Sequence, residues 1–77
     1  MTNEDIALKL RRHATALARG GDNLYRVRAF RQAAMAVLTL TEPVADLVSA
    51  RGPAALEQVP GIGKSLAQTI AVISSEA

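Results

Sequence analysis

Apolar residues recur every three to four positions along most of this 77-residue chain, which is the spacing of one face of an α-helix. The first such stretch covers residues 3–19, and its expected buried stripe is Ile6, Leu10, Ala14 and Leu17. The second covers residues 24–40, and its expected buried face is Val27, Phe30, Ala34, Val37 and Leu38. The pattern therefore predicts two long amphipathic helices in the first half of the chain.

Polar residues and glycines mark the ends of these two helices. Thr2 or Asn3 can cap the first helix, because a side-chain oxygen there accepts a hydrogen bond from a free backbone N–H. The glycine pair 20–21 ends that helix, and Asp22 or Asn23 can cap the next one. Short connections of this kind are typical of helix bundles.

Three shorter helices are expected in the second half. Thr41, followed two residues later by Pro43, predicts a third helix that Thr41 caps and Gly52 stops. Pro53 opens a shorter fourth helix. A fifth helix begins at Lys64 or Ser65, after the turn that contains Gly61 and Gly63. The apolar residues expected to face the core of these helices are Val44, Leu47, Val48, Leu56, Val59, Leu66, Ala67, Ile70 and Ile73.

The composition supports helix throughout. Fifteen residues are alanine, the strongest helix former, and only one Phe and one Tyr are present, so the core must be aliphatic and closely packed. No linker or repeat interrupts the pattern. The sequence predicts an all-α fold, a compact bundle of four to five short helices, in a single domain that covers residues 1–77.

Several classes of site and location are excluded by what the chain contains. It has no cysteine and one histidine, His13, so disulfides, thiolate metal sites and histidine-rich zinc sites are excluded. We expect His13 to border the core. The N-terminus is acidic and polar, so it lacks the basic segment followed by an apolar one that marks a signal peptide. The longest apolar run is far shorter than the roughly 20 residues of a membrane span. We expect a cytoplasmic protein.

Charge is divided unevenly between two parts of the chain. Residues 9–31 hold seven basic residues and one acidic residue, a net +6, whereas the remainder carries −4. Seven of the nine basic residues in the chain are arginine, which suits phosphate contacts. Arg26, Arg28 and Arg31 are therefore candidates for DNA phosphate binding, although each could equally belong to a solvated helix face. Tyr25 beside them could stack on a base or half-pack on the domain edge.

The turn before the fifth helix, Val59-Pro60-Gly61-Ile62-Gly63-Lys64-Ser65, is the most specific motif. Its two glycines let a ligand approach the main chain, and it leads into a helix N-terminus, where free N–H groups favour an anion. We expect Ile62 to turn inward, Lys64 to add positive charge, and Ser65 to cap the helix or donate to a phosphate. The alternative is a tight corner without a ligand. The spacing fits neither a nucleoside triphosphate loop nor a dinucleotide fingerprint.

The stretch "LEQVPGIGKSLAQTI" resembles the helix-hairpin-helix motif of DNA-binding proteins. Upstream, "NLYRVRAFRQAAMAVLTL" is similar to the N-terminal domain of X-family DNA polymerases, the group of DNA polymerase beta, and the resemblance runs from residue 3 to about residue 73. It implies a domain that binds DNA phosphates through hairpin amides. It also implies a Na⁺ or K⁺ ion held by three main-chain carbonyls, which by position are those of Glu57, Val59 and Ile62.

The departures from that family concern its lyase chemistry. The lysine that forms a Schiff base falls on Thr69 and its supporting lysine on Ser65, and neither residue can form an imine. The family's phenol falls on Phe30, and a histidine of the same helix falls on Tyr25. We therefore expect a free-standing module that keeps the DNA-binding part of the site and lacks the catalytic one.

Three hypotheses follow for function. The first is sequence-independent binding of DNA through backbone phosphates, in DNA repair or replication, with gapped, nicked or single-stranded DNA as the partner. The second is a protein interaction module in which the arginines contact an acidic partner. The third is a residual 5′-deoxyribose-phosphate or abasic-site lyase, which would have to use Lys9 or Lys64, the two lysines of the chain.

Overall fold

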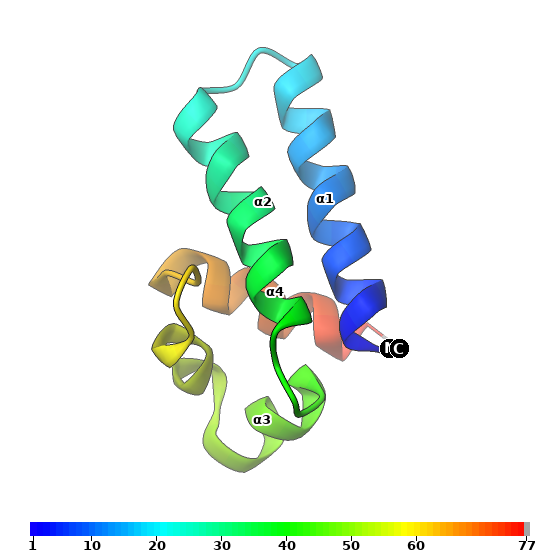
Figure 1. Ribbon diagram of the computed structural model, residues 1–77, viewed down its shortest axis with the longest axis vertical. Helices are drawn as coiled ribbons and strands as arrows, with labels where there is room; N and C mark the ends of the chain where they lie inside the picture. Colours follow the sequence, from blue (N-terminus) through cyan, green and yellow to red (C-terminus); the bar gives the residue numbers. More distant parts are fainter. Residues whose placement is uncertain (77) are drawn as a thin grey trace.

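Two long helices form an antiparallel pair along the length of the molecule (Figure 1). The structure is a computed structural model and describes residues 1–76. Helix α1 (Asn3–Arg19) begins at a capping box, because the Thr2 hydroxyl accepts from the Asp5 N–H at 3.1 Å and the Asp5 carboxylate accepts from the Thr2 N–H at 3.0 Å. Helix α2 (Leu24–Leu38) is capped by Asn23, which accepts from the Arg26 N–H at 2.9 Å. Both predicted helices are confirmed.

The remaining elements form a smaller layer across one end of this pair. Helix α3 (Val44–Arg51) and the 3₁₀ helix η1 (Pro53–Gln58) lie beyond the end of α2, and α4 (Lys64–Ser75) crosses behind α1 and α2 (Figure 1). No strand occurs between residues 1 and 76, so the all-α prediction is confirmed. The expected fourth helix is instead a 3₁₀ helix of six residues, a tighter form that often serves as a connector.

The predicted cap of α3 is wrong. Pro43 occupies the N-cap position, and it has no side-chain oxygen that could accept a hydrogen bond. The cap comes instead from the start of α1, where the Asn3 Oδ1 accepts from the Val44 N–H at 2.9 Å. The same amide donates through Nδ2 to the Glu42 carbonyl at 2.9 Å. Asn3 therefore joins the first turn of α1 to the first turn of α3, and Thr41 plays no part in the cap.

The core is aliphatic and closely packed, as the composition predicted. Its largest fully buried side chains are Ile6, Leu10, Val27, Val37, Val44, Leu56 and Ile70. Six alanines are also buried, namely Ala7, Ala14, Ala33, Ala34, Ala36 and Ala67, and their small side chains let the helices approach closely. Leu17, Val48, Val59, Leu66 and Ile73 are partly buried against this cluster.

One expected core residue is not in the core. Leu38 is 48% exposed, because the preceding residue, Val37, turns towards the core and leaves Leu38 on the outer side of α2. Sequence reasoning also missed Ala7, Ala33 and Ala36, whose methyl groups are buried only because neighbouring helices pass over them. Within residues 1–76, no helix has the length and apolar character needed to cross a membrane.

Candidate nucleic-acid interface

The turn between η1 and α4 is held against α2 by its apolar residue and its first glycine. Ile62 is 4% exposed, which confirms that it points inward, and its N–H donates to the Val59 carbonyl at 3.0 Å. Gly61 has φ of 93°, a region that other residues rarely adopt. A Cβ there would lie 3.4 Å from the Ala36 Cβ, so α2 closely approaches this part of the turn.

The second glycine leaves the start of α4 open. Gly63 is the N-cap, with φ of −85° and ψ of 176°, and it makes no side-chain capping bond. Within residues 1–76 no acceptor is recorded for the N–H groups of Lys64, Ser65 and Leu66, the first three residues of the helix. The expectation that Ser65 could cap α4 is wrong, because Ser65 is already the second residue of the helix. By contrast, Thr2 and Asn23 cap α1 and α2 with their side chains.

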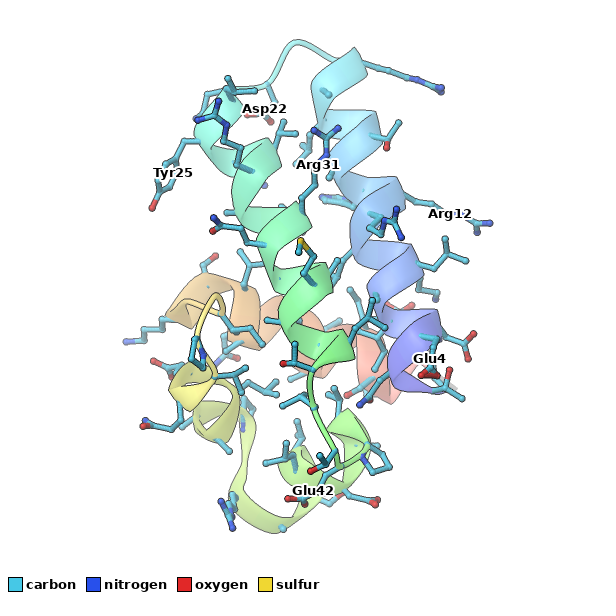
Figure 2. All side chains as sticks on the ribbon, viewed as in Figure 1. Glu4, Arg12, Asp22, Tyr25, Arg31 and Glu42 are labelled. Atoms are coloured by element: carbon cyan, nitrogen blue, oxygen red, sulfur yellow. The ribbon has the colours of Figure 1, made fainter. Side chains whose placement is uncertain are left out.

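These open N–H groups face solvent beside α2. The turn and the first residues of α4 line one side of a shallow hollow of about 420 Å³, and Tyr25, Ala29 and Gln32 line the other. Tyr25 is 84% exposed, so it does not half-pack on the domain edge but extends freely at the rim of the hollow (Figure 2). Sequence reasoning missed Gln32, whose place is visible only once α2 and the turn are together. The exposed Lys64 adds a positive charge to this hollow.

The structure does not bring the three candidate arginines to this hollow. Arg26 pairs with the Asp22 carboxylate at 3.4 Å. Arg31 lies in a groove between α1 and α2, where it is visible in Figure 2. Arg28 is exposed on the outer side of α2, three residues before Arg31. None of these guanidinium groups lines the hollow of the turn. They could therefore attract an anion in the hollow only through long-range charge, not by direct contact.

The three carbonyls expected to bind a monovalent ion have the right chemistry for one. In a 3₁₀ helix the Glu57 carbonyl would accept from residue 60, but this residue is Pro60, which has no N–H. Among residues 1–76, no N–H of a turn or loop donates to the carbonyl of Glu57 or Ile62. The Val59 carbonyl accepts one bond, from the Ile62 N–H, and keeps a second lone pair. Neutral oxygens of this kind suit a hard cation. Outside such carbonyls, the described residues contain no cluster of His, Cys, Asp and Glu able to hold a metal.

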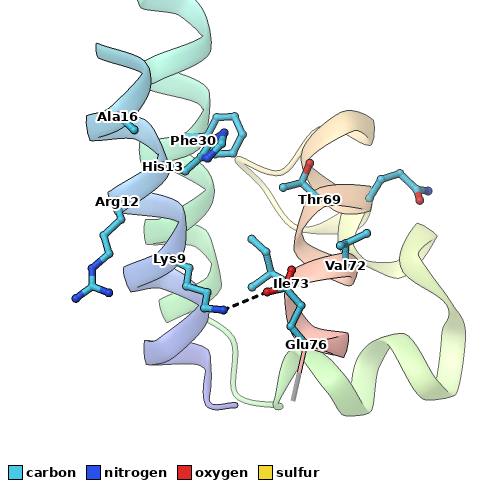
Figure 3. Close-up of a pocket in the computed structure, with 10 residues that line it drawn as sticks. Lys9, Arg12, His13, Ala16, Phe30, Thr69, Val72, Ile73 and Glu76 are labelled. Carbon is cyan, nitrogen blue, oxygen red and sulfur yellow. Dashed lines mark hydrogen bonds and ion pairs between the residues drawn. The ribbon is translucent and has the colours of Figure 1, made fainter. Parts of the chain in front are cut away.

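A larger cleft of about 670 Å³ opens between α1, α2 and α4 on another side of the molecule (Figure 3). His13 packs against Phe30 there, with ring centroids 4.6 Å apart, which places His13 at the edge of the core as expected. The Thr69 hydroxyl donates to the Ser65 carbonyl at 3.2 Å. Lys9 enters this cleft from α1 and pairs with Glu76 at 3.2 Å.

The sequence matches a known protein family. The family model described as a helix-hairpin-helix domain matches residues 1–76. Neither a curated protein nor a solved structure matches the chain. The matched span includes both the open turn before α4 and the α1–α2 pair that supports it.

Proposed function

Since the chain belongs to the helix-hairpin-helix domain family, we propose that it binds DNA through backbone phosphates at the turn before α4. Domains of this family commonly bind DNA without sequence preference. The observation that carries the proposal is the start of α4, where a glycine N-cap leaves three N–H groups of an exposed helix terminus without an acceptor among residues 1–76. A helix terminus of this kind favours an anion, because its N–H groups and its dipole both face the ligand.

In this proposal one phosphate accepts hydrogen bonds from the open N–H groups of Lys64, Ser65 and Leu66. The absence of a Cβ at residue 63 lets phosphate oxygens approach the main chain. The Lys64 ammonium adds charge attraction, and Gln32 across the hollow can donate from its amide. Contacts of this type position the protein on the backbone without reading bases.

The finer features of the ligand rest on Tyr25 and on the family resemblance. An aromatic ring exposed at the rim of a phosphate site suits stacking on an unpaired base. We propose that gapped, nicked or single-stranded DNA is the partner and that the protein serves DNA repair or replication, in the manner of the X-family N-terminal domain. The positive charge of residues 9–31 would attract the DNA over a distance of about a Debye length, roughly 10 Å at 0.1 M salt.

A salt titration tests the proposal. The dissociation constant is measured by fluorescence anisotropy for intact, nicked, gapped and single-stranded DNA, each in two unrelated sequences. We expect log affinity to fall linearly with log salt, with a slope of about −0.9 for each duplex phosphate contacted and little difference between sequences. Absence of binding to every DNA at about 50 mM salt would refute the proposal.

The carbonyls of Glu57, Val59 and Ile62 would hold Na⁺ or K⁺ behind the turn. Such an ion would supply positive charge next to the bound phosphate and would fix the turn in its binding conformation. If the carbonyls hold such an ion, DNA affinity at constant ionic strength is expected to be lower in tetramethylammonium chloride than in potassium chloride. Equal affinity in the two salts would contradict the ion site and leave the phosphate site standing.

We further propose that this chain binds DNA without imine chemistry. Thr69 and Ser65 have no amine, Lys9 pairs with Glu76, and Lys64 is exposed at the turn. Lysines that form Schiff bases are activated by an apolar pocket or by a neighbouring cation. Lys64 is exposed and Lys9 lies beside a carboxylate, so neither has that environment. Borohydride reduction in the presence of abasic-site DNA is expected to leave no covalent adduct. An adduct that Lys9→Arg or Lys64→Arg removes would establish a lyase.

A further inference from the structure

An exposed stripe of residues runs along the outer side of α2. Its members are spaced alternately by four and three residues, which is the spacing of a helix-packing seam. They are Leu24, Arg28, Arg31, Met35 and Leu38, and we call them the α2 stripe. Its apolar members are 59% (Leu24), 69% (Met35) and 48% (Leu38) exposed. Scattered apolar side chains on a surface need no explanation, but Met35 and Leu38 lie one turn apart and form an exposed apolar pair that follows the two arginines of the stripe.

The lower part of the α2 stripe forms one wall of a groove. Arg31, Met35 and Leu38 line it from α2, and Arg11 and Thr15 line it from α1, around a hollow of about 450 Å³. Figure 2 shows Arg31 between the two helices on the face of the molecule turned to the viewer. No residue of this groove lines the hollow beside the α4 turn, so the two surfaces are distinct.

The charges of the groove have one sign. Arg11 and Arg31 flank it, Arg28 lies one turn along α2, and no acidic residue lines it within the described chain. The only ion pair of α2 recorded among residues 1–76 is that of Arg26 with Asp22, so the arginines of the stripe keep their charge available. A ligand for this surface must therefore combine apolar side chains with negative charge.

We propose that this groove binds an acidic amphipathic helix of a partner protein. A helix laid along α1 and α2 would place apolar side chains against Met35 and Leu38 and carboxylates against Arg31 and Arg11. This arrangement is the helix-in-groove mode of recognition, in which anchors repeat every three to four residues. The charge complementarity sets the orientation of the helix and rejects basic partners.

Two other occupants fit the surface less well. A second copy that packed its own groove against this one would bring arginines against arginines, and like charges in contact oppose association. DNA would satisfy the arginines, but it would leave Met35 and Leu38 against phosphates and gain nothing from their apolar surface. The inference does not depend on DNA binding at the α4 turn, because the two surfaces share no residue.

Nuclear magnetic resonance with a synthetic peptide tests the proposal. The probe is a helical peptide of about 21 residues, long enough to span α2, with leucine at seam positions and glutamate beside them. A peptide with lysine in place of every glutamate is the charge control. We expect the acidic peptide to shift the amide signals of Arg11, Arg31, Met35 and Leu38 and to leave those of Gly63 and Lys64 unchanged. Gly61 is not used as a control, because it lies beside Met35.

Two variants identify the contact. Arg31→Glu is expected to weaken binding of the acidic peptide at least about tenfold, whereas Arg12→Glu, the same charge change on the other side of α1, has little effect. Gly63→Asp should leave peptide binding unchanged. This separates the groove from the proposed DNA site, since that variant is aimed at the turn alone.

The other outcomes overturn the inference. They are equal binding of the lysine peptide, shifts confined to the α4 turn, and no binding of the acidic peptide at millimolar concentration. Self-association of the protein that Arg31→Glu changes would assign the groove to a second copy. Shifts of the α2 stripe on adding duplex DNA, with none at Gly63 or Lys64, would assign it to nucleic acid.

Discussion

Gly63 offers the sharpest test of the phosphate site, because the structure separates its role in folding from its role in binding. Its backbone is extended, with φ of −85° and ψ of 176°, so any residue can adopt this conformation without strain. A Cβ built there meets no atom within 4 Å. Gly61 is unsuitable for the same test, because its φ of 93° and its contact with Ala36 would strain the turn.

The expected effect of Gly63→Asp on stability is a gain. An N-cap carboxylate accepts a hydrogen bond from the free N–H groups of the first turn, and its charge is favourable at the positive end of the helix dipole. Asp exceeds Gly at an N-cap by a few tenths of a kcal/mol, and the dipole adds about 0.3–1 kcal/mol. We therefore expect the free energy of unfolding to rise by about 0.5–1.5 kcal/mol, a shift of several degrees in Tm for a domain of this size.

The expected effect of the same change on DNA binding is a large loss. A side chain at the N-cap lies over the open N–H groups, so the carboxylate would occupy the place of the phosphate and repel it. A hydrogen bond to a charged group is worth about 1.5–3 kcal/mol, so losing even one such bond weakens binding about 10- to 150-fold. Loss of one phosphate contact should also reduce the salt slope by about 0.9.

The assay measures Tm by circular dichroism and DNA affinity by anisotropy on the same preparations. Ala45→Asp is the matched control, because it adds the same charge to the exposed first turn of α3. We expect the control to keep the parental salt slope and nearly all of the affinity. The reasoning is refuted if Gly63→Asp retains the parental affinity and salt slope. Equal losses in both variants would show that net charge, and not the α4 turn, governs binding.

Three further predictions concern other parts of the molecule. Asn3→Ala removes both hydrogen bonds at the start of α3 and should lower the free energy of unfolding, measured in urea, by about 1–2 kcal/mol. Thr41→Ala should change this free energy by less than about 0.5 kcal/mol, and equal effects of the two variants would contradict the assigned cap. Tyr25→Ala should weaken binding of single-stranded DNA about 5- to 100-fold without lowering Tm, and an unchanged affinity would remove the stacking role. Hydrogen bonding from the Thr2 backbone N–H, and then from the Thr2 side chain, lowers the pKa of Asp5 below its ordinary value of 3.8. The stabilisation by the Asp5 carboxylate is therefore present above pH 3.8 and lost as pH falls through the lower folded pKa. The urea midpoints of the parent and Asp5→Asn should accordingly converge as pH falls from about 5 to about 2, and an Asp5 pKa above 3.8 in a carbon-detected titration would contradict this.

Local signals predicted most of the fold. Thr2, Asn23 and the glycines between α1 and α2 act on neighbouring residues, so their effect is readable from the sequence. The start of α3 was predicted wrongly because its cap comes from Asn3, 41 residues away, and only the folded chain brings the two together. Leu38 was misplaced for a related reason, since its periodicity marks an apolar face but cannot tell which neighbour covers it.

The candidate site was predictable to a similar extent. The glycines and Ile62 of the turn have their roles fixed by local geometry, and the structure places Ile62 inward as expected. The rotation of α2 against α4 decides which side chains lie beside the turn. It places Tyr25 there and keeps Arg26 and Arg31 away. That rotation is set by packing over small alanine side chains, which give a weak sequence signal.

The bond between Asn3 and the start of α3 has a consequence for how the molecule opens. The α1–α2 hairpin is made of contacts close in sequence and can form early, whereas the layer of α3, η1 and α4 docks through contacts that close long loops. Asn3 joins these two cooperative units near the beginning of the chain. A change at the N-terminus should therefore be detected in the hydrogen exchange of α3, and, through η1, in the mobility of the turn that presents the phosphate site.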